Sequence, residues 1–204
     1  MSFSWQEWVA AACFLVSVWL LARNRPSGWW IGLIGSALYI WIFSVVWLPG
    51  EILIQVYLAL TSLWGIWVWL RGGAMHEGRP VGRASRRLMV WTSAIGLVAW
   101  ALLYWAFSTV AGRVPFWDSL TTVISFIAQI YLVMRLVESW HLWLAVDVIY
   151  IPLYASRGLY VTAGLYAVFL VLAWQGLKNF EREWAEDRAA GRSTNTGARP
   201  GVQS

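Results

Sequence analysis

Seven long apolar runs follow one another along this sequence and leave it few possible folds. A helix needs about 20 predominantly apolar residues to cross the hydrocarbon core of a bilayer. The runs cover residues 5–22, 29–48, 51–70, 89–110, 116–135, 140–156 and 159–178. Charged residues, glycine and proline lie between them, as expected for connections between helices. The sequence therefore predicts an all-α integral membrane protein with seven transmembrane helices.

The composition agrees with a membrane protein and limits it to one domain. Hydrophobic residues make up 60% of the chain and charged residues only 12%, whereas a soluble domain carries about 25% charged residues. Seven spans use up most of the 204 residues. We therefore expect a single transmembrane domain over residues 1–180, followed at residues 181–204 by a polar, disordered cytoplasmic tail.

The basic residues predict the orientation in the membrane. One side of the predicted topology carries Arg23, Arg25, Arg71, Arg79, Arg83, Arg86, Arg87, Arg135, Lys178, Arg182, Arg188, Arg192 and Arg199. The other side carries only Arg113 and Arg157. Because Lys and Arg are enriched on cytoplasmic connections, the N-terminus is predicted outside and the C-terminus in the cytoplasm. The same excess explains the net charge of +5, so we expect no nucleic-acid partner.

The two halves of the sequence resemble each other. A shift of 111 residues pairs Trp29 with Trp140, Ser36 with Asp147, Tyr39 with Tyr150 and Phe43 with Tyr154. A shift of 109 pairs Tyr57 with Tyr166, and a shift of 112 pairs Trp19 and Arg23 with Tyr131 and Arg135. These pairings predict three helices, one connecting helix and three more helices, arranged as a parallel repeat about an axis along the membrane normal. Chance coincidence between two aromatic-rich helical patterns is the alternative.

Polar residues inside the spans fall on single helical faces. The stripes comprise Gln55 and Ser62 in the third span, Thr122, Ser125 and Gln129 in the fifth, and Trp143, Asp147 and Tyr150 in the sixth, with Trp140 one turn earlier. A polar atom in hydrocarbon is costly and faces the interior of a helix bundle. The stripes therefore predict a polar cavity lined by aromatic rings. The alternative is that the Ser, Thr and Gln side chains only hydrogen-bond neighbouring helices.

Asp147 is the strongest single signal among these polar residues. It lies near mid-depth of its span, where an acidic side chain costs about 2.5–3.5 kcal/mol on insertion scales. A hydrogen-bonded protonated carboxyl, an arginine partner or a cationic ligand could offset that penalty. The eighteen tryptophans also allow two interpretations, since their rings occur in interfacial belts and on surfaces where flat ligands stack.

Several motifs together resemble the PnuC family of vitamin transporters. They are Phe116-Trp117-Asp118-Ser119, Glu138-Ser139-Trp140-His141-Leu142-Trp143, Arg157-Gly158-Leu159-Tyr160, Gln55-Val56-Tyr57 and Trp64-Gly65-Ile66-Trp67. The resemblance covers about residues 5 to 180 and is densest in the second half. It implies the same helix arrangement of three plus one plus three, a SWEET-like layout, in the bacterial inner membrane.

The resemblance also implies a function. It predicts uptake of nicotinamide riboside by facilitated diffusion, trapping by a cytosolic kinase that feeds NAD synthesis, and a homotrimer. By position, Trp140 and Trp143 would form the aromatic pair of the site, Gln55 and Gln129 would make polar contacts, and Tyr150 would line it. The first-half motif adds Trp67 as a candidate.

The chain departs from the family pattern at two positions. Many nicotinamide riboside carriers of the family have Asn where this chain has Asp147, and Tyr where it has Trp64. Related branches carry thiamine or riboflavin. A carboxylate favours the cationic rings of nicotinamide riboside or thiamine over neutral riboflavin, so charge leaves two candidates.

Other classes of function fit the sequence less well. The spans hold no histidine cluster, no paired carboxylates on one helix and no Ser-His arrangement, so we expect neither an enzyme nor a cofactor. Cys13 is the only cysteine, and His76 and His141 are isolated, so we expect no metal site. The absence of a Gly-x-x-x-x-Gly-Lys phosphate loop favours transport without a nucleotide-binding domain. A membrane assembly subunit and a small sugar transporter remain as alternatives.

Overall fold

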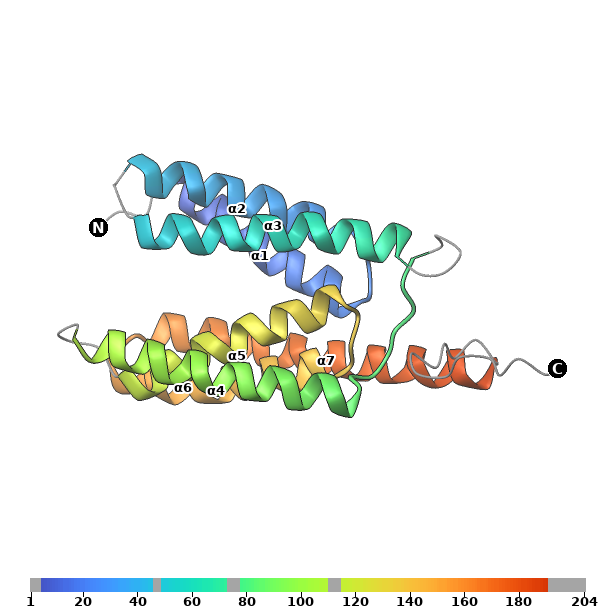
Figure 1. Ribbon diagram of the computed structural model, residues 1–204. Helices are drawn as coiled ribbons and strands as arrows, with labels where there is room; N and C mark the ends of the chain where they lie inside the picture. Colours follow the sequence, from blue (N-terminus) through green and yellow to red (C-terminus); the bar gives the residue numbers. More distant parts are fainter. Residues whose placement is uncertain (1–4, 46–48, 73–77, 110–114, 191–204) are drawn as a thin grey trace.

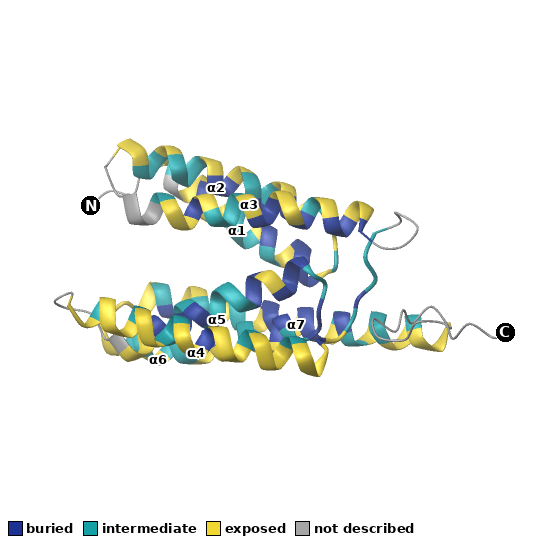
Figure 2. Ribbon diagram, viewed as in Figure 1, coloured by how far each residue is buried: buried dark blue, intermediate teal, exposed yellow. Residues whose placement is uncertain are grey.

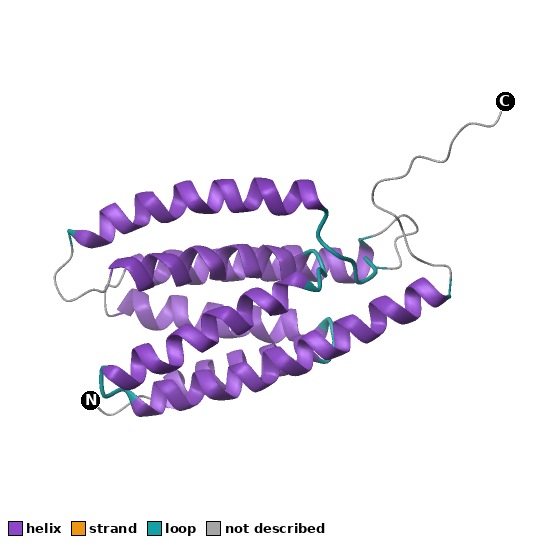
Figure 3. Cartoon of the chain, turned by 90° about the horizontal axis from the view of Figure 1, so that it is seen from below, coloured by secondary structure: helices purple, strands orange, loops and turns teal. Residues whose placement is uncertain are grey.

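The computed structural model describes residues 5–45, 49–72, 78–109 and 115–190. Seven α-helices make up the regular structure of this part of the chain (Figure 3). They are α1 (Trp5–Ala22), α2 (Ser27–Val45), α3 (Pro49–Arg71), α4 (Arg86–Ser108), α5 (Pro115–Val133), α6 (Glu138–Ser156) and α7 (Tyr160–Ala189). Five of them, α2, α3, α4, α5 and α7, are long and apolar enough over their described residues to cross a membrane.

The last helix continues further than the sequence analysis predicts. Helix α7 has 30 residues and ends at Ala189, so residues 181–189 are helical and not part of a disordered tail. The extension packs through its own side chains. Trp184 packs against the buried cluster that contains Phe180, and Glu183 forms an ion pair with Arg135 at 2.8 Å. Residues 191–204 of the predicted tail lie outside the described part of the chain.

The helices form two groups that face each other across the molecule (Figure 1). In the first group α2 packs against both α1 and α3, and in the second α6 packs against both α5 and α7. Helix α4 packs against α5 on the side of the second group. Contacts of α1 with α7 and of α3 with α5 join the two groups.

Four of the six pairs of helix bounds differ by 111 residues between the groups. Helix α2 spans 27–45 and α6 spans 138–156, α1 and α5 end at Ala22 and Val133, and α3 and α7 begin at Pro49 and Tyr160. The shifts of 112 and 109 expected for the first and third helix pairs are therefore wrong by one and two residues. Aromatic residues are frequent enough in these helices to align at neighbouring shifts, which explains the error.

The turn after the first helix of each group has the same conformation in both groups. Asn24 and Arg135 have φ values of 57° and 54°, in the left-handed region that residues other than glycine seldom adopt. The amide of Asn24 donates to the carbonyl of Leu21 at 2.9 Å, and the amide of Arg135 donates to that of Leu132 at 3.0 Å. The equivalent of Arg135 is thus Asn24 and not Arg23.

A tryptophan packs on a glycine in both groups, at the end of the molecule where the groups meet. A Cβ atom added to Gly65 would lie 2.5 Å from the ring of Trp29, and one added to Gly176 would lie 2.5 Å from the ring of Trp140. Both tryptophans are 1% exposed. Buried residues concentrate at this end, which we call the arginine-rich end because Arg79 and Arg135 lie there (Figure 2).

Candidate functional site

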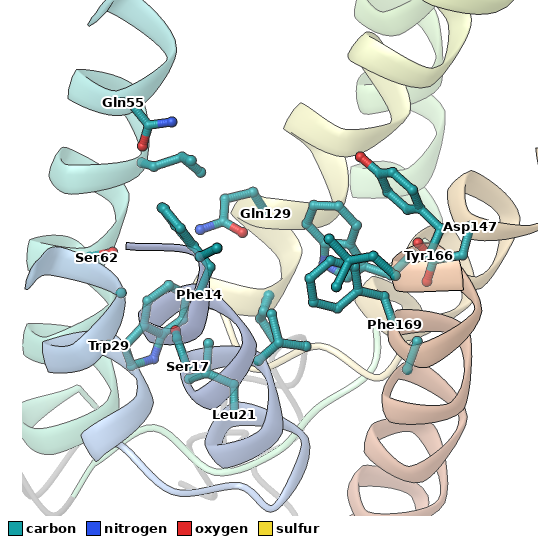
Figure 4. A pocket seen from close by; sticks show the side chains of 18 of the residues that line it. Phe14, Ser17, Leu21, Trp29, Gln55, Ser62, Gln129, Asp147, Tyr166 and Phe169 are labelled. Carbon is teal, nitrogen blue, oxygen red and sulfur yellow. The ribbon is translucent and has the colours of Figure 1, made fainter. Parts of the chain in front are cut away.

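A cavity of about 470 Å³ lies between the two helix groups. Its lining comes from α1, α2, α3, α5, α6 and α7. Figure 4 shows Phe14, Trp29 and Gln55 on the side of the first group, and Asp147, Tyr166 and Phe169 on the side of the second. The cavity is therefore formed where the groups face each other.

The lining residues follow the offset of 111 between the groups. Seven pairs of lining residues are separated by it: Val18 and Gln129, Leu21 and Leu132, Trp29 and Trp140, Gly32 and Trp143, Gln55 and Tyr166, Leu58 and Phe169, and Ser62 and Ala173. Each group thus presents these seven helix positions to the cavity, while other lining residues, such as Asp147, have no lining partner at this offset. The side chains at these positions differ, and the polar groups are distributed unequally.

The polar part of the lining is acidic and amide-rich. Asp147 is 3% exposed and lies beside Tyr166 (Figure 4). Gln129 donates to the hydroxyl of Thr61 at 3.3 Å, while Oε1 of Gln55 is buried without a hydrogen-bond partner among the described residues. No Arg, Lys or His belongs to the lining in the described part of the chain. The site is suited to a ligand that carries positive charge and hydrogen-bonding groups.

Aromatic rings form two walls of the cavity. On the first group the rings of Phe14 and Tyr39 lie 5.7 Å apart. On the second, Tyr166 stacks on Tyr154 with centroids 5.3 Å apart and planes 7° from parallel. Such rings provide flat apolar surfaces for a planar ligand, so the walls can hold an aromatic ring while the polar groups bind its substituents.

Six of the ten residues predicted for the site line this cavity: Gln55, Ser62, Gln129, Trp140, Trp143 and Asp147. The structure places Thr122, Ser125, Tyr150 and Trp67 elsewhere. Thr122 donates to the carbonyl of Asp118 at 2.6 Å on its own helix. Ser125 is half-buried on α5, one turn before Gln129.

Tyr150 and Trp67 lie outside the lining of this cavity for clear structural reasons. Tyr150 packs against Tyr166 with ring centroids 4.7 Å apart, so Tyr166 stands at the cavity and Tyr150 contacts it from α6. Trp67 is 60% exposed. It follows Gly65 by two residues, and Gly65 faces Trp29, so the helical rotation of about 200° turns Trp67 to the opposite side of α3.

Sequence reasoning missed much of the lining from α1, α2 and α7. The largest of the missed side chains are Phe14, Trp29, Tyr39, Phe43, Tyr166 and Phe169. One available signal was the repeat itself. Trp29 pairs with Trp140 and Tyr166 with Gln55 at the shift of 111, so each predicted site residue in one half points to a candidate in the other.

The comparison with protein families decides the identity of the chain. The sequence pattern of a family described as "Nicotinamide mononucleotide transporter" matches residues 4–185. The chain belongs to this transporter family. Its relatives include the nicotinamide riboside transporter PnuC of Escherichia coli (strain K12), 28% identical over 199 residues that cover 85% of this chain and 83% of the relative.

Another relative is named for a different vitamin. The riboflavin/roseoflavin transporter RibM of Streptomyces davaonensis is 27% identical over 94% of this chain and 99% of its own length. The crystal structure of the vitamin B3 transporter PnuC matches this fold with a TM-score of 0.68 and 22% sequence identity, covering 90% of this chain and 83% of the other. The PnuC resemblance drawn from the motifs is confirmed, and the chain shares the PnuC fold.

Proposed function

We propose that this chain takes up nicotinamide riboside across the bacterial inner membrane by facilitated diffusion. The nicotinamide ring stacks between the aromatic walls, and Gln55 and Gln129 bind the ribose or the carboxamide. A cytosolic kinase phosphorylates the nucleoside after release, which traps it and feeds NAD synthesis. The names of relatives such as PnuC of Escherichia coli support this choice of vitamin.

The charge of the cavity is the observation that carries the proposal. The carboxyl group of Asp147 lines it, and no basic side chain does so in the described part of the chain. A pyridinium ring gains from a nearby carboxylate, because two opposite charges attract strongly where water is excluded. A mononucleotide adds a phosphate of about −1.5 to −2 charge with no basic partner to receive it. The nucleoside is therefore the better ligand.

Transport by rocking of the two helix groups fits the position of the cavity. We propose seven transmembrane helices arranged as two three-helix units joined by α4, with alternating access to a site between the units. The equal helix bounds at an offset of 111 support this arrangement. Asn24, Arg79 and Arg135 lie at one end of the bundle, which supports a cytoplasmic location for that end. The homotrimer stays a prediction, checked by mass measurement in detergent.

Thiamine is the second candidate, since its thiazolium ring is also cationic and Asp147 favours it for the same reason. Riboflavin, the vitamin in the name of the relative RibM, is neutral and gains less from a carboxylate. A small sugar would also stack on aromatic rings, and it too lacks a positive charge.

Calorimetry on the detergent-solubilised protein tests the proposal. We expect nicotinamide riboside to bind, nicotinamide mononucleotide to bind at least about tenfold more weakly, which corresponds to about 1.4 kcal/mol, and riboflavin not to bind. Trp143→Ala removes a ring of the lining and should weaken binding by a similar factor. Tight binding of thiamine alone would move the assignment to that vitamin, and binding of neither cation would overturn the proposal.

Two further variants make the calorimetry more specific. Trp91→Ala is the matched control for Trp143→Ala, because Trp91 is 68% exposed on α4, away from the cavity. It should leave the affinity unchanged. Exchange of labelled vitamin in proteoliposomes without an ion gradient tests facilitated diffusion, and a strict need for a sodium or proton gradient would contradict it.

A further inference from the structure

Arg135 lies where several segments of the chain meet at the arginine-rich end. Its Nη2 atom donates to Oδ1 of Asn24 at 2.8 Å and to Oε1 of Glu183 at 2.8 Å. Its Nη1 atom donates to the carbonyl of Arg79. The side chain is only 13% exposed, so most of its hydrogen-bonding capacity is directed into the protein. We call Arg135, Asn24, Glu183 and the Arg79 carbonyl the arginine clamp.

The clamp joins the two helix groups and the segment between them. Asn24 belongs to the turn after α1, Arg135 to the turn after α5, and Glu183 to α7. The guanidinium also lies over the ring of Trp69 on α3, 4.9 Å from its centroid. Trp69 Nε1 in turn donates to the carbonyls of Leu132 and Val133, at 3.2 and 3.1 Å. The bond to Asn24 and the contacts with Trp69 have to break if the groups separate at this end, whereas the ion pair with Glu183 lies within the second group.

The segment between α3 and α4 reinforces the same junction. The amide of Arg79 donates to the carbonyl of Val68 on α3 at 3.1 Å, and the amide of Gly82 donates to the carbonyl of Arg135 at 3.0 Å. The segment is thus bound to both groups within four residues. Val81, between these two bonds, is 4% exposed and belongs to the same buried cluster as Trp69.

The clamp lies beside the floor of the cavity. Leu21, Leu132 and Trp29 belong both to the cavity lining and to the buried cluster at this end. Figure 2 shows the buried residues gathered there. The ion pair described at the opposite end joins Arg157 to Asp118 at 3.7 Å and lies within the second group. At the arginine-rich end, by contrast, the Arg135 guanidinium reaches across to the first group, to Asn24 and to the ring of Trp69.

We propose that the arginine clamp is the gate that holds the arginine-rich end of the cavity shut, and that loss of the Arg135 contacts opens the cavity to that side. The position of the gate follows from these contacts. Only its role as a step of transport rests on the proposed function. The contacts of one guanidinium with Asn24 and Trp69 across the groups favour two discrete states, closed with these contacts formed or open with them lost.

The buried guanidinium keeps an ionic partner on its own side of the gate. Desolvation lowers the pKa of Arg135 from its ordinary value, and the nearby carboxylate of Glu183 opposes that shift. A buried charge without its partner is strongly destabilising. Because Glu183 and Arg135 belong to the same helix group, their ion pair can stay formed when the contacts with Asn24 and Trp69 are lost.

Thiol labelling tests the gate without any vitamin. In a Cys13→Ser background, Ser62→Cys places one thiol in the cavity lining, and a charged, membrane-impermeant thiol reagent is added from each face of membrane vesicles. From the arginine-rich face we expect Arg135→Gln to raise the labelling rate about tenfold, as a shift in the population of the open state. Glu183→Gln and Asn24→Gly should raise it less, and Asn24→Gly keeps the positive φ of that turn.

Arg83→Gln is the matched control. Arg83 is an arginine on the same segment, its side chain is 46% exposed, and its ion pair with Glu181 is long at 4.0 Å. The Arg83→Gln variant should be labelled at the same rate as the parent protein that carries only Cys13→Ser and Ser62→Cys. Should Arg135→Gln fail to fold, Glu183→Gln and Asn24→Gly decide the question. Clamp variants that label no faster than Arg83→Gln would overturn the gate.

The labelling result is separable from the proposed substrate. Faster labelling of the clamp variants, in a protein that binds none of the tested vitamins, supports the gate and overturns only the vitamin assignment. Vitamin binding with unchanged labelling supports the vitamin assignment and overturns the gate.

Discussion

Helices α1–α3 and helices α5–α7 present the same seven positions to the cavity, but five of the seven pairs differ in side chain. The retained pairs, Leu21 with Leu132 and Trp29 with Trp140, lie at the floor, where the groups pack together. The differing pairs include Gln55 with Tyr166 and Ser62 with Ala173. Packing positions thus match between the groups, while the other paired positions of the cavity lining do not.

The difference separates the residues that pack the helices together, which we call the frame, from the residues that line the rest of the cavity. The frame needs a large ring against a glycine in each group, because a Cβ atom at Gly65 or Gly176 would overlap the facing tryptophan. The proposed binding site needs an unequal distribution of charge, since nicotinamide riboside, the proposed ligand, has different groups at its two ends. Asp147 therefore has the neutral Ser36 as its equivalent in the first group.

Removing either floor tryptophan should have the largest effect. Trp29→Ala and Trp140→Ala each leave a cavity in a fully buried site, and each should destabilise the protein by about 3–5 kcal/mol. The melting temperature in detergent measures this, and similar losses are expected from both. A loss from only one of them would contradict the idea that the two groups share a frame.

Filling the space beneath the tryptophans should have the next largest effect. Gly65→Ala and Gly176→Ala each place a methyl group 2.5 Å from an indole ring, and overpacking of this kind costs about 1–3 kcal/mol. Gly164→Ala is the control, because a Cβ atom at Gly164 has no neighbour within 4 Å. A melting temperature for Gly65→Ala equal to that of Gly164→Ala would show that the ring can move away.

Substitutions of Asp147 and Ser36 should differ most clearly in their effects on the affinity for the vitamin. Asp147→Asn removes the carboxylate of the cavity. It should weaken the binding of a cationic vitamin about tenfold, which corresponds to about 1.4 kcal/mol. Ser36→Ala should leave the affinity unchanged, and it should be neutral or slightly stabilising because the buried hydroxyl has no hydrogen-bond partner among the described residues. Calorimetry measures the affinities, and melting curves measure the stability. Equal affinities for wild type and Asp147→Asn would show that the charge of Asp147 does not determine specificity.

Trp69→Phe should have the smallest effect. It gives the first group the aromatic residue that the second group has at the equivalent position, Phe180. The ring remains, but the bond from Nε1 to the carbonyls of Leu132 and Val133 is lost, at a cost of about 0.5–1.5 kcal/mol. A loss as large as that of Trp29→Ala would mean that this hydrogen bond, and not ring packing, holds the groups together.

The sequence by itself determined the class of protein and the number and approximate bounds of its helices. Apolar runs interrupted by Arg, Gly and Pro were sufficient, because backbone polar groups in a membrane must be paired within helices. It also selected Gln55, Ser62, Gln129, Trp140, Trp143 and Asp147, which the structure brings to one cavity. Polar atoms within apolar helices are unusual enough to mark the inward face.

Only the tertiary structure decided which aromatic residues face the cavity. Tryptophan is amphipathic and is accommodated both by lipid and by a packed core, so composition alone could not separate exposed Trp67 from buried Trp29. The continuation of α7 to Ala189 and the Arg135 contacts with Asn24 and Glu183 were equally hidden. They join residues 48 and 111 positions apart in the chain, a distance over which helical periodicity carries no information.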